Sequence, residues 1–222
     1  DTLDTLAQLR AKMARLQEST PSAMPLETHP ALAGLVQLRV GASYSVDSAA
    51  LALAMLAGPS GSGEWCAVVG VADFGAEAAD ALGIDLGRTV LVPDPGEQWL
   101  EVTAALVDVA TMVLVRPTGK VSHRIAEKLS ARLRKRGAAL VAWEPMPGAW
   151  PRCEVRLTTR DPVWGGLGQG HGHLISRRII IEAQRGTAPA RRSALWFPAE
   201  DQTYRPADPD AIRSTAAVEG VA

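Results

Sequence analysis

Short apolar runs alternate with segments of helical spacing through the middle of the chain. The apolar runs contain almost no polar positions, which is typical of strands buried on both faces of a sheet. Strands are predicted at residues 35–40, 65–71, 89–92, 111–115 and 138–143. Helices are predicted at residues 48–57, 76–82, 97–109 and 120–136. This alternation predicts an α/β fold with a mostly parallel central sheet and helices on both faces.

The pattern changes after residue 145. Strands are predicted at residues 153–158, 174–183 and 195–197, and the glycine-rich segment 165–174 separates the first two. No helical spacing lies between these strands. We therefore expect them to extend the central sheet as antiparallel strands or hairpins.

Both ends of the chain differ from the middle. Four apolar residues recur at helical spacing near the N-terminus: Leu6, Leu9, Met13 and Leu16. They predict an amphipathic helix over residues 1–18, whose apolar stripe either folds back on the core or packs on another protein. Prolines mark residues 19–33 as a linker. A single domain is expected at 34–199, followed by a flexible tail at 200–222, where Pro, Asp and Ala dominate.

Composition favours a soluble globular protein. Of the 222 residues, 47% are hydrophobic and 21% are charged, and the net charge of −1 gives no sign of a nucleic-acid partner, although local basic faces remain open. Cys66 and Cys153 lie in apolar runs and are expected to be buried, reduced thiols. No apolar run approaches the roughly 20 residues of a membrane span. A cytoplasmic location without membrane contact is expected.

A candidate phosphate loop lies at residues 41–48. The working pattern is G-x-x-x-x-G-K-[ST], in which backbone N–H groups and a lysine hold the phosphates. Gly41 and Ser48 match its ends, but Val46 replaces the second glycine and Asp47 replaces the lysine. A carboxylate at this position repels a polyphosphate. The alternative is an ordinary strand-to-helix turn in which Ser48 caps the helix.

Residues 34–115 resemble bacterial RecA. The segment A-A-D-A-L-G-I-D-L-G-R-T-V-L-V at 78–92 is similar to RecA, and so is P-D-P-G-E-Q-W-L-E-V at 93–102. The candidate loop at 41–48 falls in register with the Walker A loop of RecA. The resemblance implies a RecA-like fold whose nucleotide site is degenerate.

By the same resemblance, Glu97 takes the position of the catalytic glutamate, and Arg116 takes the position of the Walker B aspartate. Two of the three charged elements of the site are thus inverted, at Asp47 and Arg116. We expect a pseudo-ATPase with no catalytic residue, no nucleotide cofactor and no metal. An ion pair between Asp47 and Arg116 is a hypothesis, and Glu97 as an acid at a helix N-terminus is the alternative to a catalytic role.

The whole set of features resembles the ImuA-prime family, the RecA-like proteins of an actinobacterial mutagenesis cassette. Residues 164–174 (WGGLGQGHGHL), Arg177 and Arg178 also resemble that family. The resemblance implies an SOS-type role in DNA-damage-induced translesion synthesis and mutagenesis. It implies ImuB, a Y-family polymerase homologue, and an error-prone DnaE-type polymerase as partners, and it leaves RecA and DNA open as further partners.

Two groups of residues are candidates for binding a protein partner. The first is the N-terminal apolar stripe. The second lies in the late part of the chain and comprises Trp150, Trp164, Arg177, Arg178 and Trp196. Partly exposed tryptophan and arginine are favoured at interfaces. Core packing is the alternative for each tryptophan.

A DNA-binding module and a SulA-like cell-division inhibitor are the alternative functions. The first would use a basic helix face in which Lys120, Arg124, Lys128 and Arg132 recur every four residues. A solvated helix face with cations gathered near its C-terminus explains the same pattern. His171 and His173 have no third ligand nearby, so no metal site is predicted.

Overall fold

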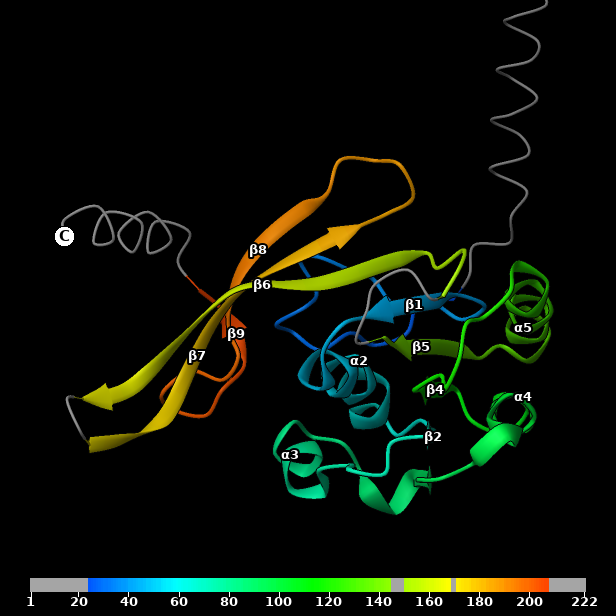
Figure 1. Cartoon of the computed structure of the whole chain (residues 1–222), viewed down its shortest axis with the longest axis horizontal. Helices are drawn as coiled ribbons and strands as arrows, with labels where there is room; N and C mark the ends of the chain where they lie inside the picture. Colours follow the sequence, from blue (N-terminus) through cyan, green and yellow to red (C-terminus); the bar gives the residue numbers. More distant parts are fainter. Residues whose placement is uncertain (1–23, 145–149, 169–170, 208–222) are drawn as a thin grey trace, which may run out of the picture.

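The computed structural model describes residues 24–144, 150–168 and 171–207. Its strands form one nine-stranded sheet in the order β3-β2-β4-β5-β1-β6-β7-β8-β9 (Figure 1). The first six strands in this order, from β3 to β6, are parallel to their neighbours, and antiparallel pairing begins between β6 and β7 and continues through β8 and β9. This arrangement confirms the predicted α/β class with a mostly parallel central sheet and antiparallel C-terminal strands.

The parallel half contains the apolar runs. Its strands are β1 (Ser43–Val46), β2 (Cys66–Val69), β3 (Thr89–Val92), β4 (Met112–Val115) and β5 (Ala139–Trp143). Every residue of β1, β2 and β4 is buried. These strands read as continuous apolar sequence because helices cover both faces of the sheet.

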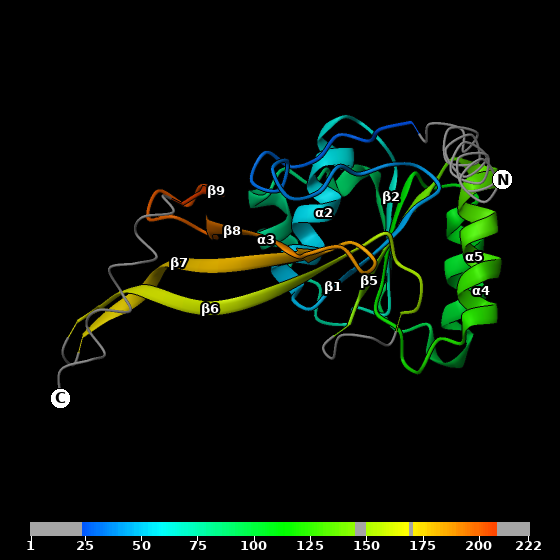
Figure 2. The same cartoon turned by 90° about the horizontal axis from the view of Figure 1, so that it is seen from above.

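The helices form two layers. On one face lie α2 (Ala49–Gly61) and α3 (Ala76–Ala81), and on the other lie α4 (Trp99–Val107) and α5 (His123–Arg136), as Figure 2 shows. Two short 3₁₀ helices, η1 (Leu86–Arg88) and η2 (Gly96–Gln98), flank β3. No helix in the described part of the chain is long and apolar enough to cross a membrane.

Helix α5 begins at a capping serine and ends at a glycine, two residues that favour helix ends. The hydroxyl of Ser122 accepts a hydrogen bond from the N–H of Ile125, which caps the first turn. Gly137 ends the helix in the left-handed conformation at φ 68°. Leu129 and Leu133 form the buried stripe of the helix, and the opposite face carries its charges.

The antiparallel half begins with β6 (Val155–Gly168), which pairs with β1 through residues 155–157 and then with β7 (His171–Gln184) along its length. Strands β8 (Arg191–Trp196) and β9 (Arg205–Pro206) complete the sheet. In Figures 1 and 2 the β6–β7 pair extends well beyond the helical body. Register shifts between Arg160 and Val163 and between Gly165 and Leu167 interrupt its pairing.

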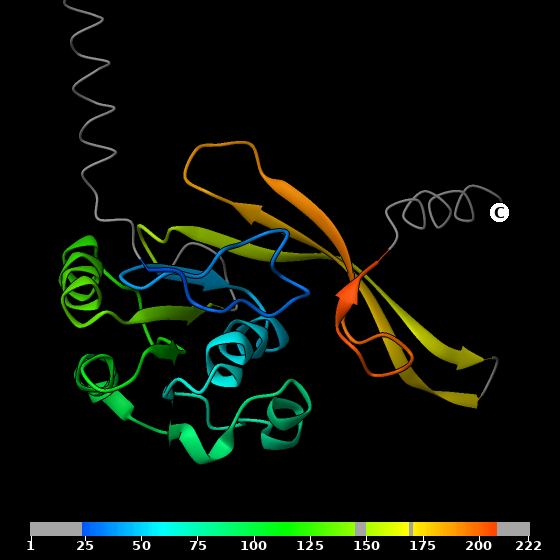
Figure 3. The same ribbon diagram turned by 180° about the vertical axis from the view of Figure 1, so that it is seen from behind.

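The segment before β1 differs from the expectation. The predicted strand at 35–40 is wrong, because there only Arg39 pairs with another strand-like residue, in an isolated bridge to Pro25. The segment instead covers α2, and a Cβ atom on Gly58 of that helix would collide with the backbone of Glu27. Figure 3 shows this segment, in blue, beside α2. Its apolar residues are buried against the helix: Leu26, Ala31, Leu32, Leu35, Val36 and Leu38.

The expected domain ends also shift. Residues 24–33, assigned to the linker, are part of the packed domain, since Leu32 is fully buried. At the other end, residues 200–207 of the expected tail include β9, and the ring of Tyr204 lies 4.7 Å from that of Phe197. The predicted helix at 1–18, with its Leu6–Leu16 stripe, lies outside the described residues, as does the tail from 208 onward.

Candidate functional site

The β1–α2 turn is shorter than a phosphate loop. Ser43–Val46 form β1, so only Asp47 and Ser48 connect that strand to α2. The predicted loop is therefore wrong: Val46 is a buried strand residue, and Gly41 lies at the opposite end of β1. A Cβ atom on Gly41 would lie 2.9 Å from Cγ of Arg134, at the far end of α5. Tyr44 and Val46 favour a strand here, between β5 and β6.

Asp47 and Ser48 stabilise this turn by bonding within the protein. The N–H of Thr159 in β6 donates to Oδ2 of Asp47 at 2.7 Å, and its hydroxyl donates to Oδ1 at 3.0 Å. The hydroxyl of Ser48 accepts from the N–H of Leu51 at 3.3 Å, which makes it the N-cap of α2. The strand-to-helix turn is thus the correct alternative for these two residues.

Arg116 follows β4 and has other partners. Its guanidinium carbon lies 4.4 Å from the ring centroid of Trp143, and its Nη1 lies 3.3 Å from Oδ1 of the exposed Asp73. Among the described residues no ion pair joins Arg116 to Asp47. The hypothesis of an Asp47–Arg116 pair is therefore wrong, since Thr159 takes both carboxylate oxygens of Asp47.

Aromatic side chains occupy the space beside this turn. A cavity of only about 50 Å³ remains between the start of α2, β4 and the segment after β2, with Phe74 and Trp143 in its lining. Pockets that bind small molecules measure about 300–1,000 Å³. Among the described residues, this cavity beside the short turn is therefore smaller than a nucleotide pocket.

A buried carboxylate near the same end of the sheet was not predicted. Glu144 follows β5 directly and is 2% exposed. The hydroxyl of Ser45 donates to its Oε2 at 3.0 Å, and Nε of Arg156 lies 3.5 Å from the same hydroxyl. Buried carboxylates need such partners. The sequence signal was slight, namely one acid at the end of an apolar strand and before a proline.

Glu97 does not join this group. It is exposed in η2, just before α4, at the end of the edge strand β3. Strand β3 stands four positions from β1 in the sheet. At about 4.8 Å for each position, that places the two strands roughly 19 Å apart. The location of Glu97 fits an acid near a helix N-terminus.

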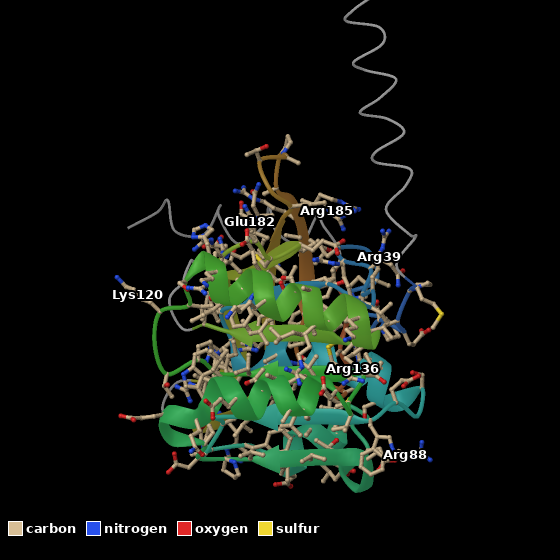
Figure 4. All side chains as sticks on the ribbon, turned by 90° about the vertical axis from the view of Figure 1, so that its right-hand side faces the viewer. Arg39, Arg88, Lys120, Arg136, Glu182 and Arg185 are labelled. Atoms are coloured by element: carbon tan, nitrogen blue, oxygen red, sulfur yellow. The ribbon has the colours of Figure 1, made fainter. Side chains whose placement is uncertain are left out.

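The basic residues of the predicted ridge are exposed, but they do not form one uniform face. Figure 4 shows Lys120 at the edge of the molecule. Lys120 precedes α5, which begins at His123 and not at 120. Arg132 forms two 2.7 Å hydrogen bonds with Asp108, to which Arg136 also binds. The hydrogen bond from Arg132, followed by the charges of both arginines, lowers the pKa of Asp108 to about 2. Of the predicted ridge residues within α5, Arg124 and Lys128 form no ion pair in the described structure, and neither do Arg134 and Lys135 in the last turn.

The late tryptophans separate into buried and exposed residues. Trp150 is 1% exposed and packs in the core, so its assignment to a partner surface is wrong. Trp196 is half-buried in β8. Trp164 is 46% exposed, and the guanidinium of Arg177 lies 5.1 Å from its ring. Arg178, on the same strand as Arg177, is half-buried.

The outer end of the β6–β7 pair carries an exposed apolar surface. We call residues 163–168 and 171–175 the distal ribbon. It contains five large exposed apolar side chains: Val163, Trp164, Leu167, Leu174 and Ile175. Pairing of β6 with β1 ends at Leu157, and pairing of β7 with β8 begins at Arg178. The distal ribbon is thus two-stranded, and its exposed apolar surface makes it a candidate interaction site.

The cysteines are free thiols. Burial raises the pKa of Cys66 to about 12 and also raises that of the half-buried Cys153. Thiolate chemistry at neutral pH is disfavoured at both residues.

The fold and these contacts define an α/β protein with a mostly parallel sheet, closed turns at the strand ends and a projecting antiparallel ribbon. The chain belongs to the MT3502 N-terminal domain family, whose family model matches residues 31–152. It is similar to the uncharacterized protein Rv3395c of Mycobacterium tuberculosis, with 33% identity over 159 residues, which is 71% of this chain and 76% of that protein. The family match ends just before β6, so the distal ribbon lies beyond it.

Proposed function

We propose that the protein is a non-catalytic, RecA-like accessory protein that assembles a translesion-synthesis complex. Its partners would be an ImuB-type polymerase homologue and an error-prone DnaE-type polymerase. The observation that carries this proposal is the distal ribbon, an exposed apolar surface on a projecting pair of strands. The resemblance to the ImuA-prime family supplies the identity of the partners.

Three features support the RecA-like and non-catalytic parts of the proposal. The mostly parallel sheet followed by antiparallel strands is what the RecA resemblance implies. The β1–α2 turn is bonded to β6 through Asp47. The adjoining cavity of about 50 Å³ is too small for a nucleotide.

The distal ribbon has the chemistry of a protein-docking element. Trp164 is held in place by Arg177, whose Nε donates to the carbonyl of Phe197 at 3.0 Å. A tryptophan ordered in this way gives a large contact area at small cost in conformational entropy. The open edges of a two-stranded ribbon also offer N–H and C=O groups for an added strand.

The proposal is tested by the affinity of the full chain for the purified ImuB-type homologue, measured by biolayer interferometry. Trp164→Ala is expected to weaken binding by at least about 10-fold, as for a central interface tryptophan. Trp65→Ala is the matched control, because Trp65 is 50% exposed and lies on the helical body. Equal affinities for the two variants would contradict docking through the ribbon, and an absence of binding by the wild type would contradict the proposed partner.

A further inference from the structure

A second surface lies at the opposite end of β6 from the distal ribbon. It is a cavity of about 420 Å³, within the usual range for ligand-binding pockets. Three parts of the chain line it: the segment before β1, the paired ends of β6 and β7, and the connection from β7 to β8. The lining residues include Leu35, Val36, Arg39, Val155, Arg185 and Arg191.

The floor of this pocket is apolar and rigid. Leu35, Val36, Val155 and Ala183 line it, and each of them is less than one tenth exposed. Val155 and Ala183 belong to the sheet, and Leu35 and Val36 belong to the segment that covers α2. A floor held by both the sheet and the core does not need to form when a ligand arrives, which favours binding.

The charge around the floor is positive. Arg39, Arg185 and Arg191 line the pocket, and no carboxylate does. Nη1 of Arg185 lies 3.1 Å from Oε1 of Glu154, and Nη2 of Arg191 donates to the carbonyl of Gly34 at 2.8 Å. These contacts fix two of the three arginines at the rim. Figure 4 shows Arg39 and Arg185 on the same side of the molecule.

Arg39 is the arginine available to a ligand. Its backbone N–H donates to the hydroxyl of Tyr44 at 2.8 Å, which anchors the residue in place. Within the described residues its guanidinium makes no hydrogen bond and no ion pair, although the residue is half-buried. A guanidinium held at the edge of an apolar floor suits a carboxylate, because it presents paired donors in a fixed geometry.

We propose that this pocket binds an acidic segment of a partner protein, with one carboxylate on Arg39 and an adjacent apolar side chain on the floor. The apolar floor does not suit the phosphates of a nucleic acid, which bind to polar and basic surfaces. Alternation of acidic and apolar residues matches both parts of the pocket. The site is separate from the distal ribbon and goes beyond the function proposed above.

The test uses the full chain and a fluorescein-labelled octapeptide of alternating Asp and Leu, with binding measured by fluorescence anisotropy. Arg39→Ala is expected to weaken binding by about 10-fold, since a charged hydrogen bond is lost. Ala188→Glu places a negative charge on the exposed connection beside the pocket and should weaken binding similarly. Lys120→Ala, which removes one exposed charge elsewhere, and Trp164→Ala should leave binding unchanged.

Three results would overturn the proposal. One is equal weakening by Lys120→Ala, which would show attraction by overall charge. Another is comparable binding of the peptide with Lys in place of Asp. The third is full displacement of the peptide by inorganic phosphate at an equal concentration, which would show a site for small anions. None of them depends on the ribbon, so failure here is distinguishable from failure of ImuB binding.

Discussion

The two halves of the sheet differ in how they use their apolar residues. In the parallel half, β1, β2 and β4 are fully buried between two helical layers, whereas the edge strand β3 is partly exposed. Asp47 and Arg116, two charged positions of the expected nucleotide site, bond to neighbouring residues. In the antiparallel half, the β6–β7 pair leaves the body and exposes five large apolar side chains. This difference is the basis of our proposal that the ribbon, and not the parallel half, contacts a partner.

The largest effect on partner affinity is expected when the ribbon is shortened. Gly165 and Ser176 lie directly opposite each other in the β6–β7 pair. Replacing residues 166–175 with Asn-Gly would join them through a two-residue turn that suits a hairpin. Affinity for the ImuB-type homologue should fall by at least about 100-fold, or about 2.7 kcal/mol. The thermal unfolding midpoint should change little; a large drop would mean that the ribbon stabilises the body.

Two leucine-to-alanine variants compare how much the parallel half and the ribbon contribute to the free energy of unfolding. Leu133 is fully buried under the sheet, whereas Leu167 of the ribbon is 64% exposed. Leu133→Ala should lower the free energy of unfolding by about 2–5 kcal/mol because it leaves a cavity. Leu167→Ala should change it by less than about 0.5 kcal/mol. Urea denaturation measures both, and a similar cost for the two variants would contradict the assignment of separate roles.

Asp47→Ala tests the closed turn of the parallel half. The variant loses two hydrogen bonds and leaves the N–H of Thr159 without its acceptor, so we expect a loss of about 1–3 kcal/mol in the free energy of unfolding. Ser62→Ala is a milder control, because the hydroxyl of Ser62, just after α2, donates one hydrogen bond to the carbonyl of Pro59 within that helix.

Nucleotide binding provides an independent check on the same turn. Calorimetry with ATP and magnesium should show no binding by the wild type. The double variant Val46→Gly, Asp47→Lys should also show none, because Val46 lies within β1 and not in a loop. Micromolar binding by either protein would contradict the non-catalytic proposal.

The sequence predicted the parallel half well because its strands are continuous apolar runs. The strand at 89–92 has the predicted bounds, and the central helices were placed to within a few residues. The strand predicted at 35–40 was wrong because Leu35, Val36 and Leu38 have the apolar spacing of a strand but cover α2. Their burial depends on a tertiary contact that no local pattern reveals.

The contacts of the ribbon and of the β1–α2 turn were also not predictable from local sequence patterns. Residues 165–174 were expected to separate two strands, yet residues 165–168 and 171–174 belong to β6 and β7 themselves. The two strands approach so closely that a Cβ atom on Gly166 would collide with the carbonyl of His173. Trp150 and Trp164 both have Pro and Gly residues nearby in the sequence, but the first is buried and the second is exposed. Asp47 and Arg116 were both identified, but their partners Thr159 and Asp73 come from other elements and were not predictable from spacing.

The smallest expected effect concerns the ion pairs that join α4 to α5 at the surface of the parallel half. Arg132 and Arg136 lower the pKa of Asp108 in the folded state to about 2, below the value of about 3.9 expected in the unfolded chain. The stabilisation is therefore complete above pH 4 and is lost as the pH falls through the folded pKa. Asp108→Asn should lower the thermal midpoint slightly at pH 7, and its difference from the wild type should close between about pH 4 and pH 2. Glu101→Gln, an exposed acid on α4, should show no such pH-dependent difference. A constant difference across this range would mean that Asp108 stabilises the protein through packing and not through its charge.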